Sequence, residues 1–264
     1  MSVVDHILGN LPGQYLSSLE QADQRWQNLR KRTPPSISQV VAHSQTSLPT
    51  IDCDVVICGG TLGIILGAAL TQRGWRVTLL ERGVLRGRDQ EWNVSRTEIK
   101  TLVELELLSP KQLEQCIAME FNPLRLQFHG GKEIWVRDVL NLGINPVTLL
   151  EALKQKFLET GGHLLEQTPF GGVVVHPNGV ELQSTAGEPH LTARLMIDVM
   201  GHGSPIAAQA RGGQLPDGIC LVVGTCAQGM PENHTGDLLV SNGPIHDHSP
   251  VSYTHLTLPT KRIV

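Results

Sequence analysis

The feature that most constrains the fold is the stretch VICGGTLGIILG, residues 56–67. The β-branched run CDVVIC predicts a buried parallel strand, and an apolar helix is expected from Thr61 to about Arg73. Gly74 is the expected left-handed stop of this helix. The run WRVTLL then predicts a second buried strand that ends at Glu81. Together these segments predict a βαβ unit of about 30 residues.

The glycine turn inside this unit fits the dinucleotide-binding pattern G-x-G-x-x-G with one departure, because its glycine positions fall on Cys58, Gly60 and Gly63. Gly60 would let the backbone approach a pyrophosphate, and Gly63 would let the helix pack closely on the strand. Cys58 requires an ordinary negative φ, so Gly59 is expected to take the unusual dihedral. Cys58 itself is interpreted as a small packing residue rather than a redox thiol.

Two further features favour a nucleotide site over a purely structural glycine turn, which remains the alternative. The helix N-terminus offers free N–H groups and partial positive charge to phosphates. Glu81 stands about 20 residues after Gly60, where a carboxylate accepts hydrogen bonds from ribose hydroxyls.

After Glu81 the strand–helix alternation stops, which is not expected of an ordinary NAD-binding domain. The segment from Arg82 to Glu98 is polar and arginine-rich, without a strand pattern. The expected elements that follow are helices Glu98–Leu108 and Pro110–Glu120, a strand element in GGKEIWVRDV, a helix Pro146–Thr160, a strand HLLEQT, a hairpin GGVVVHPNGVELQS turning at Asn178-Gly179, and a strand in LTARLMIDVMG.

This order predicts an α/β fold of the FAD-binding Rossmann type, like that of the flavin hydroxylases. It would contain a parallel sheet, a β-meander and part of a substrate domain, by analogy of fold. FAD is therefore favoured over NAD. In the hydroxylases an aspartate–glycine region lies against the flavin nucleotide, and Gly201 and Ser204 occupy comparable positions in IDVMGHGSP. Met200 stands where the acidic residue is usual, so a plain strand-end turn is the alternative.

Three regions are expected along the chain. Residues 1–50 would form a helix, Ser17 to Arg30, and a linker rich in Pro, Ser and Thr. Residues 51–250 would form the FAD-binding domain, with a substrate-domain segment inserted at about 84–145. Residues 251–264 are interpreted as a non-native tail, because VSYTHLTLPT matches one translation frame of a sequencing-library adapter. The genuine protein is then expected to continue past residue 250.

Composition excludes several classes of function. With 21 basic and 25 acidic residues and a net charge of -4, strong attraction to nucleic acid or acidic lipid is not expected. The odd number of cysteines, without a CxxC pair or a signal-peptide pattern, predicts free thiols in a reducing, cytoplasmic setting. No apolar run is long enough to span a membrane. His246 and His248 have no partner cluster, so no metal site is predicted.

A family resemblance rests on three segments: ICGGTLGIILGAALTQRGWRVTLLERGVLRGRDQEWNVSR, EIWVRDVLNLGINP and LVVGTCAQGMPENHTGDLL. Together they resemble the CruA/CruP-type lycopene cyclase family, the CruP branch most closely, over roughly residues 5–250. The resemblance implies an FAD-dependent enzyme of carotenoid metabolism, with a fold like that of flavin hydroxylases and geranylgeranyl reductases. It implies a hydrophobic polyene substrate and peripheral contact with a photosynthetic or inner membrane. No partner protein is inferred.

The resemblance also implies a reaction. An acid protonates the end of the polyene, a carbocation closes the ring, and a base removes a proton beside reduced flavin without net redox turnover. The catalytic acid and base are unknown. The alternatives are an FAD-dependent monooxygenase or isoprenoid reductase on the same fold, or a non-catalytic flavin- or carotenoid-binding protein. The 264-residue chain alone is expected to bind FAD weakly and to be inactive.

Arginines after Glu81 are candidates for the flavin pyrophosphate, since their planar fork makes paired hydrogen bonds. Arg82 and Arg96 are retained as candidates, with Arg96 left open, whereas Arg86 and Arg88 are interpreted as a solvated loop. Gly236-Asp237 is interpreted as a loop and not as a second flavin motif. The predicted cofactor-binding residues are Cys58, Gly59, Gly60, Gly63, Glu81, Arg82, Arg96 and Gly201.

Overall fold

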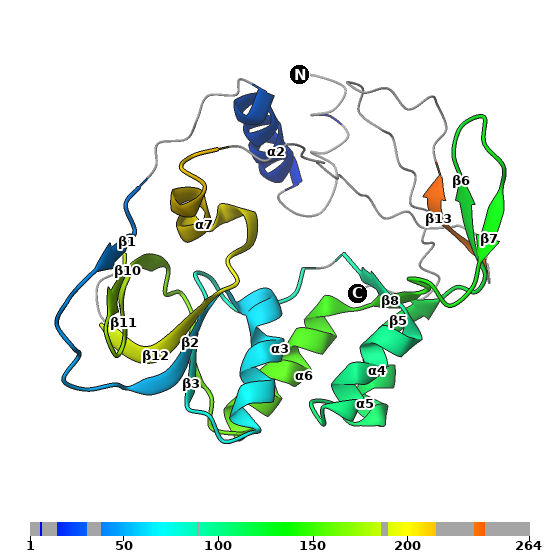
Figure 1. Cartoon of the computed structure of the whole chain (residues 1–264). Coiled ribbons are helices and arrows are strands. Elements are labelled where there is room, and N and C mark those ends of the chain that lie inside the picture. The colour runs from blue at the N-terminus through cyan, green and yellow to red at the C-terminus, as the bar shows by residue number, and fades with distance from the viewer. Residues whose placement is uncertain are drawn as a thin grey trace. The chain divides into compact units, whose positions relative to one another are not determined.

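The computed structural model describes residues 6, 15–30, 38–88, 90–185, 190–214 and 235–240 (Figure 1). The chain divides into two compact units. The first unit comprises Met1–Val40 and Pro205–Gly224 and contains helices α2 (Tyr15–Arg30) and α7 (Pro205–Ala210). The second unit comprises Val41–Ser204 and Thr225–Val264 and holds both predicted glycine turns.

A seven-stranded sheet forms the centre of the second unit. Its order is β1 (Val41–His43), β10 (Phe170–His176), β11 (Gly179–Ser184), β12 (Leu191–Asp198), β2 (Cys53–Cys58), β3 (Val77–Leu80) and β9 (His163–Leu165). The pairs β1–β10, β12–β2, β2–β3 and β3–β9 are parallel, and β10–β11–β12 is an antiparallel meander. The predicted α/β architecture, with a mostly parallel sheet and a β-meander, is confirmed.

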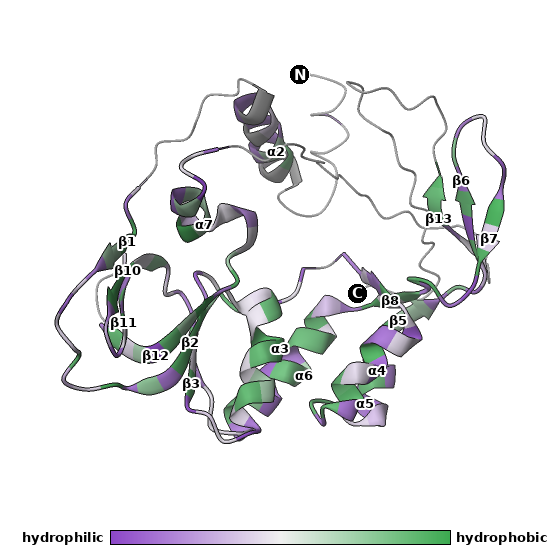
Figure 2. Cartoon of the chain, in the orientation of Figure 1, coloured by the Kyte–Doolittle hydropathy of each residue, from purple (hydrophilic) through white to green (hydrophobic). Residues whose placement is uncertain are grey.

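Helices α3 (Gly60–Thr71) and α6 (Pro146–Glu159) lie side by side and pack against the sheet (Figure 1). Figure 2 shows the apolar character of α3, whose buried residues join alternate residues of β2 and β3 in one core. A Cβ atom on Gly67 would lie 3.1 Å from the Phe157 ring, so this glycine lets the two helices approach closely. Gly74, with φ of 83°, follows α3 as the expected left-handed stop.

The segment after β3 adds smaller elements to this frame. They are β4 (Trp92–Val94), α4 (Arg96–Glu104), α5 (Pro110–Cys116), β5 (Ile117–Glu120), β6 (Leu124–Gln127), β7 (Ile134–Val136), β8 (Leu142–Ile144) and, much later, β13 (Gly236–Val240). They form two three-stranded sheets, β4-β8-β5 and β13-β6-β7. Residues of α4, α5 and β8 join the main core, so the excursion is anchored on α6 rather than separate from it.

Several predictions for this excursion and the linker are wrong in detail. Strand β4 lies in the segment expected to lack strands, the helix expected to reach Glu120 ends at Cys116, and β1 lies in the expected linker. Each of these strands is only three or four residues long and forms because a distant strand pairs with it: Trp92 and Ile117 both pair with Ile144, and Val41 pairs with Val173. So short a segment carries no alternation that a sequence pattern can detect.

Two turn assignments also differ. His176 pairs directly with Gly179, so the hairpin turns at Pro177-Asn178 and not at Asn178-Gly179. The Asn178 side chain is engaged there by the backbone of Leu48, with contacts of 2.8 and 3.0 Å. Gly236-Asp237 begins strand β13 and is not a loop, because Arg125 on β6 pairs with Asp237 at 2.7 Å.

Candidate nucleotide-binding site

Three parallel strands end at the same edge of the large sheet. Cys58, the last residue of β2, is in register with Leu80 of β3 on one side and with Asp198 of β12 on the other. The chain runs from β2 through α3 to β3 in one direction, whereas β12 arrives on the opposite side from the meander. The carboxyl ends of β2 and β12 therefore form a topological switch point, where open α/β sheets bind ligands.

Gly59 makes the turn out of β2 and has a backbone that only glycine tolerates. Its φ is 107° and its ψ 113°, while Cys58 remains in the extended strand. A Cβ atom on Gly59 would lie 2.5 Å from the carbonyl oxygen of Val199, next to the end of β12. The prediction that Gly59 takes the unusual dihedral in place of Cys58 is confirmed.

Side chains of the neighbouring strands and loops lie close to the Cα atoms of Gly60 and Gly63. A Cβ on Gly63 would lie 2.8 Å from a methyl group of Ile57 on β2, so this glycine sets the helix close to the strand as expected. A Cβ on Gly60 would lie 2.6 Å from the Leu85 side chain and 2.9 Å from Oε2 of Glu81. The helix therefore begins in direct contact with the residue at the end of β3.

The N-cap residue of α3, Gly59, supplies no capping side chain, and no acidic residue lies in the first turn of the helix. By contrast, α4, α5 and α6 begin with capping side chains from Ser95, Ser109 and Asn145. Within the described residues, no side chain and no backbone carbonyl outside the helix accepts the N–H of Thr61 or Leu62, and both residues are exposed. N–H groups in the first turn of a helix also lack an intrahelical partner. Free N–H groups at a helix N-terminus attract an anion such as a phosphate.

Glu81 lies beside the glycine turn, and two backbone N–H groups fix the position of its carboxylate. Its Oε2 accepts a hydrogen bond from the N–H of Gly60 at 2.8 Å, and its Oε1 accepts one from Gly83 at 3.1 Å. A carboxylate has about four acceptor positions, so both oxygens can still accept further donors. The side chain is thus oriented beside the glycine turn with capacity left for hydroxyl groups.

Cys58 is buried at the end of β2, with 1% of its surface exposed. Burial, together with the negative charge of Asp198, raises the pKa of the Cys58 thiol to about 12. A thiol with so high a pKa stays protonated at neutral pH and is a poor nucleophile. These properties support the interpretation of Cys58 as a packing residue.

The two candidate arginines have different surroundings. Arg82 is exposed directly after Glu81, and its side chain forms no hydrogen bond or ion pair with any described residue. Arg96 begins α4, and its guanidinium is held by Glu114 at 2.7 Å and Glu120 at 2.6 Å, which raises its pKa. The structure therefore places Arg96 in the polar network of the excursion, where both of its terminal nitrogens already donate to carboxylates.

The second glycine turn forms the other side of the switch point. Gly201 has φ of 67° and starts a short 3-10 turn, Gly201–Gly203, whose residues are exposed. The acidic residue of this turn is Asp198. The sequence pattern did not predict it, because the acid was expected at the position of Met200. The carboxylate of Asp198, two residues earlier, accepts hydrogen bonds from the Met200 N–H at 2.9 Å and from the Ser204 hydroxyl.

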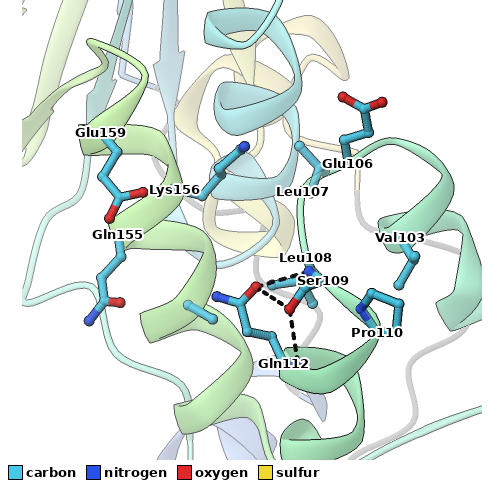
Figure 3. Close-up of a pocket in the computed structure, with 11 residues that line it drawn as sticks. Val103, Glu106, Leu107, Leu108, Ser109, Pro110, Gln112, Gln155, Lys156 and Glu159 are labelled. Atoms are coloured by element: carbon cyan, nitrogen blue, oxygen red, sulfur yellow. Dashed lines mark hydrogen bonds between the residues drawn. The ribbon is translucent and has the colours of Figure 1, made fainter.

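Two surface hollows lie away from this site. One of about 440 Å³ lies between α6 and the α4–α5 connection, and Lys156 and Glu159 on one side and Ser109 and Gln112 on the other are among the residues that line it (Figure 3). Another of about 490 Å³ is lined by residues of β11, β12 and the hairpin turn at Pro177. Neither hollow is lined by residues of the glycine turns. The candidate site is therefore defined by the backbone geometry of these turns and not by a surface hollow.

Among the described residues, no group of three or more His, Cys, Asp or Glu side chains is arranged to hold a metal ion. His246 and His248 lie outside the described residues. No helix of the described segments is both long and apolar enough to cross a bilayer.

Comparison with known proteins identifies the fold. No protein-family model and no curated protein matches the sequence. Among solved structures, the halogenase PltM in complex with phloroglucinol and FAD matches 60% of this chain with a TM-score of 0.50 and 18% identity. A ternary complex of aklavinone-11 hydroxylase with FAD and aklavinone matches 62% of this chain, with a TM-score of 0.50 and 16% identity.

This chain has the flavin-hydroxylase fold. At such low identity the likeness concerns the fold alone. The matched region spans 36% of the length of each of these two proteins.

Proposed function

We propose that this chain binds FAD at the carboxyl ends of β2, β3 and β12, and that the whole protein is an FAD-dependent enzyme. The observation that carries the proposal is the N-terminus of α3, whose N-cap residue supplies no capping side chain and which stands at the switch point beside an oriented carboxylate. A purely structural glycine turn would be expected to satisfy its first N–H groups with a cap, as α4, α5 and α6 do.

The residues present fit the adenosine diphosphate half of FAD. The N–H groups of Thr61 and Leu62 suit the diphosphate, and Arg82, which has no ion-pair partner among the described residues, supplies a cation directly after Glu81 in the chain. Glu81 offers its remaining acceptor positions to ribose hydroxyls. When bound, FAD would supply electron transfer or, in its reduced form, a negative charge beside a substrate.

For the reaction, we propose a lycopene cyclase-like enzyme of carotenoid metabolism that acts on a hydrophobic polyene. This finer proposal rests on the sequence resemblance, which includes the glycine turn and the segment that contains Arg82 and Arg96. In this proposal the chain binds and orients the cofactor, and the polyene implies peripheral contact with a membrane. The catalytic acid and base are unassigned among the described residues.

A second candidate is a monooxygenase or related flavin oxidoreductase, which the halogenase and hydroxylase of the same fold favour. Expression of the full-length gene in a host that accumulates lycopene separates the two. Cyclised product supports the cyclase. Unchanged lycopene, together with oxygen uptake driven by a reduced nicotinamide, supports the monooxygenase.

FAD binding is tested by quenching of flavin fluorescence in a titration of the purified 264-residue chain. We expect weak but saturable quenching, because the chain spans about a third of its structural neighbours and would supply only part of the cofactor contacts. ADP should compete with FAD, whereas FMN, which lacks the adenosine half, should not. Absence of saturable quenching, or competition by FMN but not ADP, would contradict the proposal.

A further inference from the structure

Both oxygens of the Asp198 carboxylate accept hydrogen bonds from residues of its own turn. Its Oδ1 accepts the N–H of Met200 at 2.9 Å, and its Oδ2 accepts the hydroxyl of Ser204. The Ser204 N–H in turn donates to the carbonyl of Gly201 at 3.1 Å. Asp198 therefore bridges the two ends of the segment 199–204.

Ser204 gives this bridge a fixed end, because only 3% of its surface is exposed. A buried hydroxyl without a partner is costly, so the bond to Asp198 stabilises one position of the segment. The residues between the two ends are different. Gly201 and Gly203 are exposed, and a Cβ on either would meet nothing within 4 Å. The segment thus presents exposed glycine backbone on either side of His202, which is also exposed.

The same segment is tied to the glycine turn of the candidate site. The N–H of Val199 donates to the carbonyl of Cys58 at 2.9 Å, and the Val199 carbonyl occupies the space that a Cβ on Gly59 would fill. A shift of residues 199–204 would therefore change how the second glycine turn lies against the turn at Gly59.

We infer that Asp198 is a positioning residue for the nucleotide. It holds the exposed backbone of Gly201–Gly203 in place beside the glycine turn of β2 and does not itself contact the ligand. The inference rests on the proposed FAD site. The competing role is a direct one, in which the negative charge of Asp198 accepts a ribose hydroxyl or repels the diphosphate.

Three variants separate these roles. Asp198→Asn keeps a similar shape: its amide oxygen can accept the Met200 N–H, and its amide NH₂ can donate to the Ser204 oxygen. Asp198→Ala removes both bonds, and Ser204→Ala removes one. For a positioning role, FAD affinity should fall about tenfold in Asp198→Ala, which matches the loss of one or two bonds to a charged group, and about threefold in Ser204→Ala. Asp198→Asn should stay within about twofold of wild type.

Amide hydrogen exchange in the protein without FAD provides a second readout. Residues 199–204 should exchange faster in Asp198→Ala than in wild type, and at near wild-type rates in Asp198→Asn. Unchanged exchange and unchanged affinity in Asp198→Ala would overturn the inference. So would an affinity in Asp198→Asn that falls as far as in Asp198→Ala, or that rises above wild type, since either result assigns the effect to the charge.

The two proposals fail in distinguishable ways. If wild-type protein shows no saturable FAD binding, the proposed function is wrong. Amide hydrogen exchange alone then decides whether Asp198 positions residues 199–204. Faster exchange in Asp198→Ala but not in Asp198→Asn supports this role, and equal exchange in wild type and both variants overturns it.

Discussion

The carboxylate of Glu81 accepts a hydrogen bond from the backbone N–H of Gly60 at 2.8 Å, which joins the end of β3 to the first residue of α3. This contact directs an acidic side chain to the one helix N-terminus, among α3 to α6, whose own N-cap residue supplies no capping side chain. The site thus combines an open anion-binding helix end with an oriented acceptor for hydroxyl groups.

Removal of the Glu81 carboxylate should weaken nucleotide binding. We expect Glu81→Ala to lower the affinity for both FAD and ADP about tenfold, because the acceptor for the ribose is lost. Titration calorimetry with each ligand measures this. Glu151→Gln, a change on the exposed face of α6, is the matched control and should leave both affinities unchanged. Equal affinities in wild type and Glu81→Ala would contradict the assigned role.

The two candidate arginines should behave differently. Arg82→Ala should weaken FAD binding about threefold, through loss of a partly solvated cation near the diphosphate. Arg96→Ala should leave FAD affinity unchanged, because the guanidinium of Arg96 is already engaged by Glu114 and Glu120. Parallel fluorescence titrations of the two variants test the distinction, and the reverse order of effects would show that Arg96 belongs to the site.

Gly59 should be intolerant of any side chain. Gly59→Ala combines a positive φ with a Cβ 2.5 Å from the Val199 carbonyl, and we expect a loss of about 3 kcal/mol or more in the free energy of unfolding. Gly74→Ala is the control, because it shares a positive φ of 83° but faces open space, and should cost about 1 kcal/mol. Urea unfolding of both variants gives the comparison. Similar costs in the two would mean that the approach of Val199 is not a constraint.

The buried Cys58 thiol should affect stability at alkaline pH. Burial and Asp198 raise its pKa from the ordinary value of 9.0 to about 12, so between these values the folded state retains a proton that the unfolded state has lost. Stability should therefore fall as the pH rises from 9 toward 12. The fall should be shallower in Cys58→Ala, measured by urea unfolding at several pH values. An identical slope in both proteins would contradict the raised pKa.

The sequence contains clear signals for the βαβ unit and the meander, and less clear ones elsewhere. Residues 53–81 combine buried β-branched runs, closely spaced glycines and a terminal acid, each of which independently predicts the same local structure. Strands β4 and β5 depend on Ile144, a partner far along the chain, so no local pattern predicts them. Short strands of this kind are determined by tertiary pairing rather than by propensity.

The same reasoning explains which residues of the candidate site a sequence pattern can indicate. Gly59, Gly60, Gly63 and Glu81 lie at fixed spacings within one unit, so the motif alone locates them. Whether Arg96 is free depends on Glu114 and Glu120, whose proximity only the fold reveals. Asp198 was not predicted, because the acid was expected directly before Gly201 and Asp198 lies two residues earlier than that. Its carboxylate accepts hydrogen bonds from Met200 and Ser204, and only the fold shows this. An acid shortly before a glycine turn is the signal that could have found it.

The amide NMR signals of the α3 N-terminus, followed while ADP is added to the isotope-labelled 264-residue chain, test the central claim most directly. The proposed site predicts that the Thr61 and Leu62 amides shift saturably and more than those of α6, because their N–H groups would bind the diphosphate. If ADP binds while these two amides stay unshifted, or if no amide shifts at saturating ADP, α3 is not the nucleotide site.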